Sequence, residues 1–135
     1  MRSDHLSPDS PGEWINRASS DLAIARTNIK DAYLEDLCYH AQQASEKALK
    51  SLLLYKIRRF PYTHDLSELL GLLEKSGIAV PDSIKDCAGM TEYAVEGRYP
   101  GFNEPLSEDD WKNSVEKAEE VVNWAKSQIP VNTLI

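Results

Sequence analysis

Four polar side chains near the middle of the chain are spaced so that they could bind an anion together. They are one imidazole, one amide and two ammonium groups: His40, Gln43, Lys47 and Lys50. On an α-helix, positions i, i+3, i+7 and i+10 stack along one side over three turns. Such a row offers several hydrogen-bond donors and positive charge to a phosphate or to the surface of a partner. The row therefore marks a candidate site for an anion or for the surface of a partner.

The segment around this row has the composition of a helix. Residues 34–55 contain neither Pro nor Gly and many strong helix formers. At about 100° per residue, one face of this helix is apolar, and it consists of Leu37, Ala41, Ala44, Ala48, Leu52 and Tyr55. The polar row lies on the opposite side, where a solvated surface is the ordinary alternative to a binding site. Glu46 and Lys50 stand in the favourable i,i+4 order for an intrahelical ion pair, and Gln43 can bond within the helix.

Further helices are expected on both sides of this one. Ser10 and Pro11 begin a first helix that should end near Lys30 or Asp31, and Thr63 or Asp65 caps a third. A fourth helix follows Pro81, with inward positions at Ile84, Cys87, Ala88, Thr91 and Ala94 or Val95. Ser107 caps the last helix. The pattern predicts an all-α fold, an up-and-down antiparallel bundle of about five helices with four long ones in the bundle. We expect a disordered N-terminus at 1–9, a helical domain at 10–129 and a tail at 130–135.

Composition limits the function classes. The chain has 135 residues and a net charge of −7, which argues against broad, non-specific binding of nucleic acid but allows a local basic site. Two isolated cysteines, Cys38 and Cys87, lack metal-site or CxxC spacing, which suits a reducing cytosol. We expect no metal and no cofactor. The sequence has no long apolar run and no signal-peptide pattern, so we expect a cytoplasmic protein that does not contact membranes.

Three short segments resemble the HEPN family (higher-eukaryote and prokaryote nucleotide-binding domains). They are YHAQQASEKALK at 39–50, THDL at 63–66 and RYP at 98–100, in the order and spacing of the family. The resemblance extends roughly from Trp14 to Ala125. It implies a helical bundle that commonly forms a homodimer. Small prokaryotic members are often paired with a minimal nucleotidyltransferase in toxin–antitoxin modules. Some members are metal-independent ribonucleases, whereas others bind a nucleotide or RNA without cleaving it.

The ribonuclease motif of the family is an Arg, four to six residues and a His, late in the bundle. Arg59 and His64 have this spacing but lie between the second and third predicted helices, and no His follows Arg98. Cleavage would need a His for proton transfer to the 2′-oxygen and an Arg for the developing phosphorane charge. His64 with Arg59 or Arg98 are the candidates, and the fold would have to bring Arg98 close.

Two hypotheses therefore remain, and the first is favoured because the late motif is missing. The first is a non-catalytic module that binds a nucleotide or RNA phosphate, a minimal nucleotidyltransferase, or both. Its predicted binding residues are His40, Gln43, Lys47, Lys50, His64, Arg98 and Tyr99. The second is a metal-independent ribonuclease toxin, so whether the chain is an enzyme stays open. A homodimer is expected from the family and from Trp124 and Ile129, apolar residues beyond the stripe of the last helix.

Overall fold

The computed structural model describes residues 1–94 and 105–135, and within them every regular element is helical. The elements are α1 (Pro11–Ala25), α2 (Leu34–Ile57), α3 (Leu66–Lys75), α4 (Asp82–Lys85), the 3-10 helix η1 (Asp86–Ala94), α5 (Glu108–Ser127) and the 3-10 turn η3 (Val131–Thr133). No described residue belongs to a strand. The predicted all-α fold with five α-helices is confirmed.

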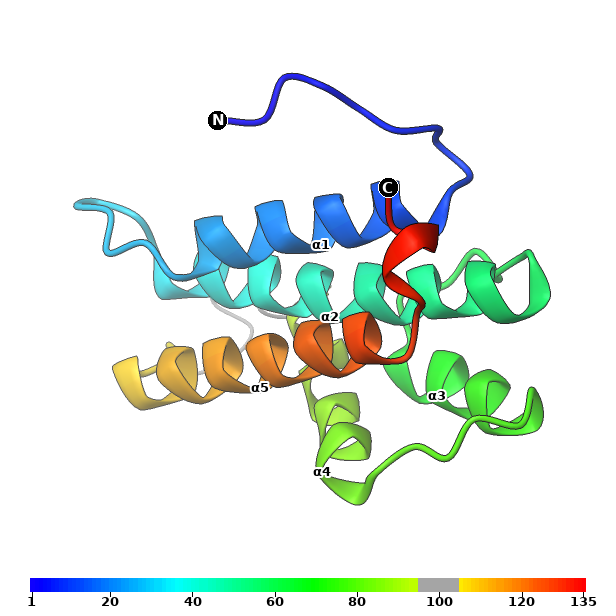
Figure 1. The fold of residues 1–135 in the computed structure, drawn as a ribbon. Coiled ribbons are helices and arrows are strands. Elements are labelled where there is room, and N and C mark those ends of the chain that lie inside the picture. The colour runs from blue at the N-terminus through cyan, green and yellow to red at the C-terminus, as the bar shows by residue number, and fades with distance from the viewer. Residues whose placement is uncertain (95–104) are drawn as a thin grey trace.

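Helix α2 is the centre of the molecule, and the other helices pack around it. It contacts α1, α5, α3 and η1. Figure 1 shows α1 antiparallel to α2, whereas α5 runs in the same direction as α2 on its other side. Helices α3 and α4 are shorter; α3 contacts α2, whereas α4 contacts η1 and α5. Because neighbours cover it on several sides, α2 has little surface left for water.

Local signals set most helix starts. The Ser10 hydroxyl accepts a hydrogen bond from the backbone N–H of Glu13, and Asp65 accepts one from Ser67. Ser107 and Asp110 form a reciprocal capping box at the start of α5. Each of these side chains satisfies a backbone N–H that has no partner inside the first turn of its helix. The predicted caps are therefore present, and α2 spans the predicted segment.

The predicted end of the first helix is wrong by about one and a half turns. Helix α1 ends at Ala25 rather than near Lys30 or Asp31. Ile29, which continues the apolar spacing, is 53% exposed, so it finds no core to pack against. Asp31 has a φ of 71°, in the left-handed region that breaks a helix and begins the approach to α2.

The fourth predicted helix is also different. It has a single α-helical turn, α4, and continues as the 3-10 helix η1. Ile84, Cys87 and Met90 are all buried at intervals of three residues. A 3-10 helix has three residues per turn, so this interval keeps all three on the core side. The predicted position Val95 lies outside the described residues.

Candidate functional site

A buried carboxylate, Glu46, is the centre of a polar network inside α2. Glu46 is 3% exposed. Its Oε2 accepts from the Nζ of Lys50 at 3.0 Å, and its Oε1 lies 2.9 Å from the Nδ1 of His64. The side-chain amides of Gln42 and Gln43 donate to the same Oε1 at 3.3 and 3.4 Å. Four side chains thus compensate one charge that burial would otherwise make costly.

Two members of the predicted polar row belong to this network rather than to the surface. Lys50 is only 5% exposed, and its ammonium lies 5.1 Å from the ring centroid of Phe60. Gln43 is buried and also donates to Gln42 Oε1 at 2.7 Å. In this conformation neither side chain is presented to a ligand, because both are bonded inside the protein.

The other two members of the row face α1. Asp21, a buried residue of α1, has one oxygen 2.9 Å from the Nδ1 of His40 and the other 2.6 Å from the Nζ of Lys47. Both partners stay partly exposed. The row therefore divides between two carboxylates, and each carboxylate joins one His and one Lys. We call these groups the Asp21 cluster and the Glu46 cluster.

His64 connects the Glu46 cluster with the surface. It lies just before α3, its ring is about half exposed, and its backbone carbonyl accepts from Gln42 at 3.3 Å. Because a carboxylate has no proton to give, the ring must carry its proton on Nδ1 to bond Glu46. Among the described residues, no hydrogen bond reaches the other ring nitrogen, Nε2. The Nδ1 atom of His64 is thus bonded to the buried Glu46, while about half of the His64 side chain remains exposed to solvent.

The α2–α3 loop (residues 58–65) displays basic and aromatic groups beside His64. Arg58 and Arg59 are exposed, and Tyr62 is 98% exposed with its ring centroid 6.1 Å from that of His64. Phe60 anchors the loop by packing edge-on against Trp14, at 4.9 Å between centroids. Arg98 and Tyr99, the remaining predicted binding residues, lie outside the described residues.

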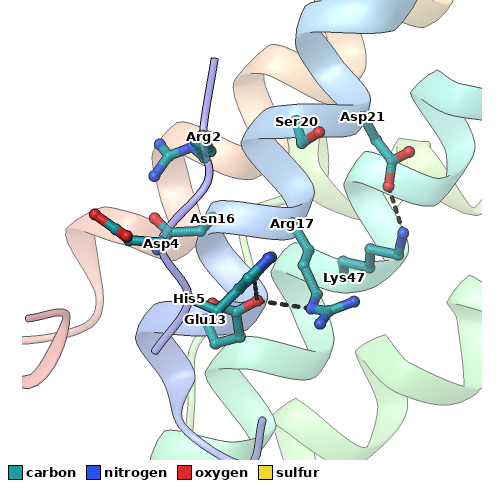
Figure 2. Close-up of a pocket in the computed structure, with 9 residues that line it drawn as sticks. All are labelled: Arg2, Asp4, His5, Glu13, Asn16, Arg17, Ser20, Asp21 and Lys47. Atoms are coloured by element: carbon teal, nitrogen blue, oxygen red, sulfur yellow. Dashed lines mark hydrogen bonds and ion pairs between the residues drawn. The ribbon is translucent and has the colours of Figure 1, made fainter. Parts of the chain in front are cut away.

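A second polar group lies where the N-terminal segment crosses α1 (Figure 2). The buried Glu13 accepts from the backbone N–H of Leu6 at 2.9 Å, from His5 at 3.1 Å and from Arg17 at 2.9 Å. The backbone N–H of Leu6, together with the His5 and Arg17 donors, lowers the pKa of Glu13 below its ordinary value. A pocket of about 240 Å³ is lined both by this group and by Asp21 and Lys47 of the Asp21 cluster. It is distinct from the α2–α3 loop.

The two cysteines do not extend the site. Burial raises the thiol pKa of Cys38 to about 11 and that of Cys87 to about 12. Neither is therefore a thiolate at neutral pH, and a thiolate is the reactive form. Among the residues that the structure describes, no group of three or more His, Cys, Asp or Glu side chains is placed to hold a metal ion. In the same part of the chain, no helix has the length and apolar character needed to cross a membrane.

The sequence alone does not single out three residues of this candidate site. Asp21 lies next to Leu22 of the apolar stripe in α1, so its spacing alone was a weak signal. Glu46 was recognised only as an intrahelical partner of Lys50, because its contact with His64 joins residues 18 positions apart. Tyr62 adjoins the predicted His64, and its position in a loop after two arginines was the available signal.

Comparison with known proteins agrees with this fold and assigns the family. The model of the HEPN domain family matches residues 12–128, and the chain therefore belongs to the HEPN domain family. The crystal structure of ST0689, an archaeal HEPN homologue, is 30% identical and has a TM-score of 0.72 over 90% of this chain and 98% of the other. TT1696 from Thermus thermophilus shares the fold, with a TM-score of 0.76, 21% identity, and coverage of 88% and 98%. No curated protein matches the chain.

Proposed function

We propose that this HEPN domain is a non-catalytic module that binds RNA or a nucleotide phosphate at the α2–α3 loop. The observation that carries the proposal is the almost fully exposed Tyr62, next to His64 and in one loop with Arg58 and Arg59. An exposed aromatic ring can stack on a nucleobase, and arginines can bond the phosphates on either side of it. The proposed phosphate site is therefore the α2–α3 loop and not the polar row of α2, which the sequence predicted.

The charge distribution supports the same end of the molecule. The first turns of α2 and α5 carry Glu35, Asp36, Glu108, Asp109 and Asp110. Both helix starts lie at one end of the bundle (Figure 1), whereas Arg58 caps the other end of α2, from which the loop folds back so that His64 meets Gln42. An anionic ligand is therefore repelled from the acidic end and attracted to the arginines where the loop begins, although the whole chain is acidic.

A binding experiment with two matched charge reversals tests this proposal. Fluorescence anisotropy of a labelled single-stranded RNA should show binding that weakens with added salt. Arg59→Glu should lower the affinity at least several-fold. Lys112→Glu, an equal charge change on an exposed residue of α5, should have a much smaller effect. Equal losses in the two variants would mean that net charge alone governs binding and would contradict a site in the loop.

Ribonuclease activity is the second candidate, and one observation favours it. His64 is oriented by Glu46 through Nδ1, the arrangement by which carboxylates fix a histidine for acid–base catalysis. Arg59 is in the same loop and could stabilise the charge that develops on a phosphate. Incubation of RNA with the protein in EDTA decides between the two candidates. Cleavage that His64→Ala abolishes would establish the ribonuclease and overturn the non-catalytic proposal.

Assembly is part of the proposal as well. Ile129 is buried and Trp124 packs against the core, so neither is left over for an interface. Exposed apolar side chains instead occur at the end of α1, in Ile24, and in the α1–α2 connection, in Ile29 and Tyr33. These residues support a homodimer with this connection in its interface. Light scattering should give twice the monomer mass, and Ile29→Glu should give the monomer. A monomeric wild type at micromolar concentration would contradict the dimer.

The family resemblance supports one further partner, a minimal nucleotidyltransferase. An adjacent gene for such a protein would provide the natural candidate. Co-expression and size-exclusion chromatography of the two proteins should then give one complex. Separate elution of two folded proteins would remove this partner from the proposal.

A further inference from the structure

The hydrogen bonds around Glu46 fix more than the position of His64. We infer that Glu46 is a positioning residue that holds His64 with its proton on Nδ1, so that Nε2 reads a ribose 2′-hydroxyl and distinguishes RNA from DNA. This inference rests on the proposed binding of RNA at the α2–α3 loop. It predicts that the loop binds RNA more tightly than DNA, although both carry the same phosphates.

The first step is the charge balance of the Glu46 cluster. The carboxylate of Glu46 is paired with the ammonium of Lys50 at 3.0 Å, and both side chains are buried. One negative and one positive charge already compensate each other. The contact with His64 at 2.9 Å therefore requires only a neutral imidazole that donates through Nδ1.

The second step is the state of the other nitrogen. In a neutral imidazole with its proton on Nδ1, Nε2 carries a lone pair and accepts hydrogen bonds. A phosphate diester offers acceptor oxygens and no proton, so it does not satisfy an acceptor. A ribose 2′-hydroxyl is a donor as well as an acceptor, and it is the group by which proteins distinguish RNA from DNA. Within the sugar–phosphate backbone, the group that fits His64 Nε2 is therefore the hydroxyl, and it is the donor that RNA has and DNA lacks.

The third step is the rigidity of the arrangement. Gln42 bonds the backbone carbonyl of His64 at 3.3 Å, while Glu46 bonds its ring. The backbone N–H of Leu66 donates to the Thr91 hydroxyl at 3.1 Å, which fixes the start of α3 against η1. The ring of Tyr62 lies beside the His64 ring, at 6.1 Å between centroids. A nucleotide whose base stacks on Tyr62 would thus bring its sugar close to an imidazole that cannot rotate freely.

Two measurements on the full chain test this inference. Long-range nitrogen–proton NMR correlations of the His64 ring identify the protonated nitrogen and should give Nδ1–H in the free protein. Anisotropy should then be measured with RNA and DNA oligomers of one sequence that contains only A and C, so that the 2′-hydroxyl is the only difference. We expect RNA to bind about three- to tenfold more tightly, the worth of one hydrogen bond.

Two variants separate the roles of His64 and Glu46. His64→Ala should bind RNA and DNA with nearly equal affinity while keeping its helical circular dichroism. The double variant Glu46→Gln with Lys50→Met removes both buried charges together, so it leaves no unpaired ion that would unfold the protein. A glutamine offers both a donor and an acceptor to Nδ1. The tautomer should therefore become mixed, and the RNA preference should fall toward one.

The outcomes distinguish this inference from the proposed function. RNA and DNA bound with equal affinity by the wild type would overturn the inference and leave phosphate binding at the loop intact. A wild-type His64 with its proton on Nε2, or a double variant with unchanged tautomer and preference, would overturn the role of Glu46. Absence of binding to either oligomer would overturn both the inference and the proposed function.

Discussion

Replacing Lys50 by methionine should destabilise the protein strongly, although the sequence suggests a surface lysine. The Nζ of Lys50 lies 3.0 Å from Glu46, and both side chains are almost fully buried. Removing one partner of a buried ion pair costs about 3–5 kcal/mol, because the other charge is left uncompensated. Here His64 and two glutamines still donate to Glu46, and methionine keeps most of the apolar stem. We therefore expect a loss of about 2–4 kcal/mol in the free energy of unfolding.

Urea denaturation of four proteins measures this effect and the coupling behind it. The proteins are the wild type, Lys50→Met, Glu46→Gln and the double variant, and urea is chosen because it does not screen charges. The double variant should be clearly more stable than the sum of the two single losses predicts, with a coupling of about 1–3 kcal/mol. If Lys50→Met stays within about 0.5 kcal/mol of the wild type, as surface substitutions do, the buried pair does not exist in solution. Lys50 would then return as a candidate phosphate ligand.

Three further predictions concern the chain ends and the loop. Gly12→Ala should lower the free energy of unfolding by about 1–3 kcal/mol in urea denaturation. A Cβ at this position would lie 2.5 Å from the backbone oxygen of Leu134 and 2.8 Å from the side chain of Leu6. A higher free energy of unfolding, as helix propensity alone would give, would contradict this packing. Glu13 has a lowered pKa, so its contribution to stability is complete above its ordinary value of 4.5 and is lost as the pH falls through the lower folded value. Thermal melts should show a smaller acid-induced loss in Glu13→Gln than in the wild type, because Asp9 and Glu120 also have lowered pKa values and still titrate in the variant. Arg58 has a φ of 64°, a left-handed conformation that glycine adopts more easily than arginine. Arg58→Gly should therefore leave the melting temperature unchanged or higher, while it weakens RNA binding in anisotropy. A clear loss of stability would show that the arginine side chain supports the fold.

Local sequence signals were sufficient for the parts of the fold that depend on neighbouring residues. The bounds of α2 follow from a run without Pro or Gly, and Asp65 and Ser107 cap α3 and α5 through contacts within three residues. The end of α1 and the conversion of α4 into η1 depend instead on where the core is. Ile29 has the right spacing but no partner, and Met90 is buried because a 3-10 turn places it above Cys87.

The candidate site shows the same division. Helical periodicity placed His40, Gln43, Lys47 and Lys50 correctly on one side of α2, but it could not tell how many neighbouring elements cover that side. In the structure the row divides alternately: His40 and Lys47 contact Asp21 of α1, whereas Gln43 and Lys50 bond Glu46, which also contacts His64. Contacts between residues separated by 18 or 26 positions determine this outcome, and a single sequence carries no record of them.

The buried polar residues of α2 therefore have a physical role that a count of charges does not suggest. An apolar replacement of a buried ion pair is often as stable as the pair itself, so the Glu46 cluster is a weak source of stability. What an apolar core would not provide is a directed bond to His64. The cluster joins a helix in the centre of the fold to one ring nitrogen at the surface. The double variant Glu46→Gln with Lys50→Met should keep the fold but lose the directed bond from Glu46 to His64. Such a variant therefore separates the effect of the cluster on stability from its effect on ligand recognition.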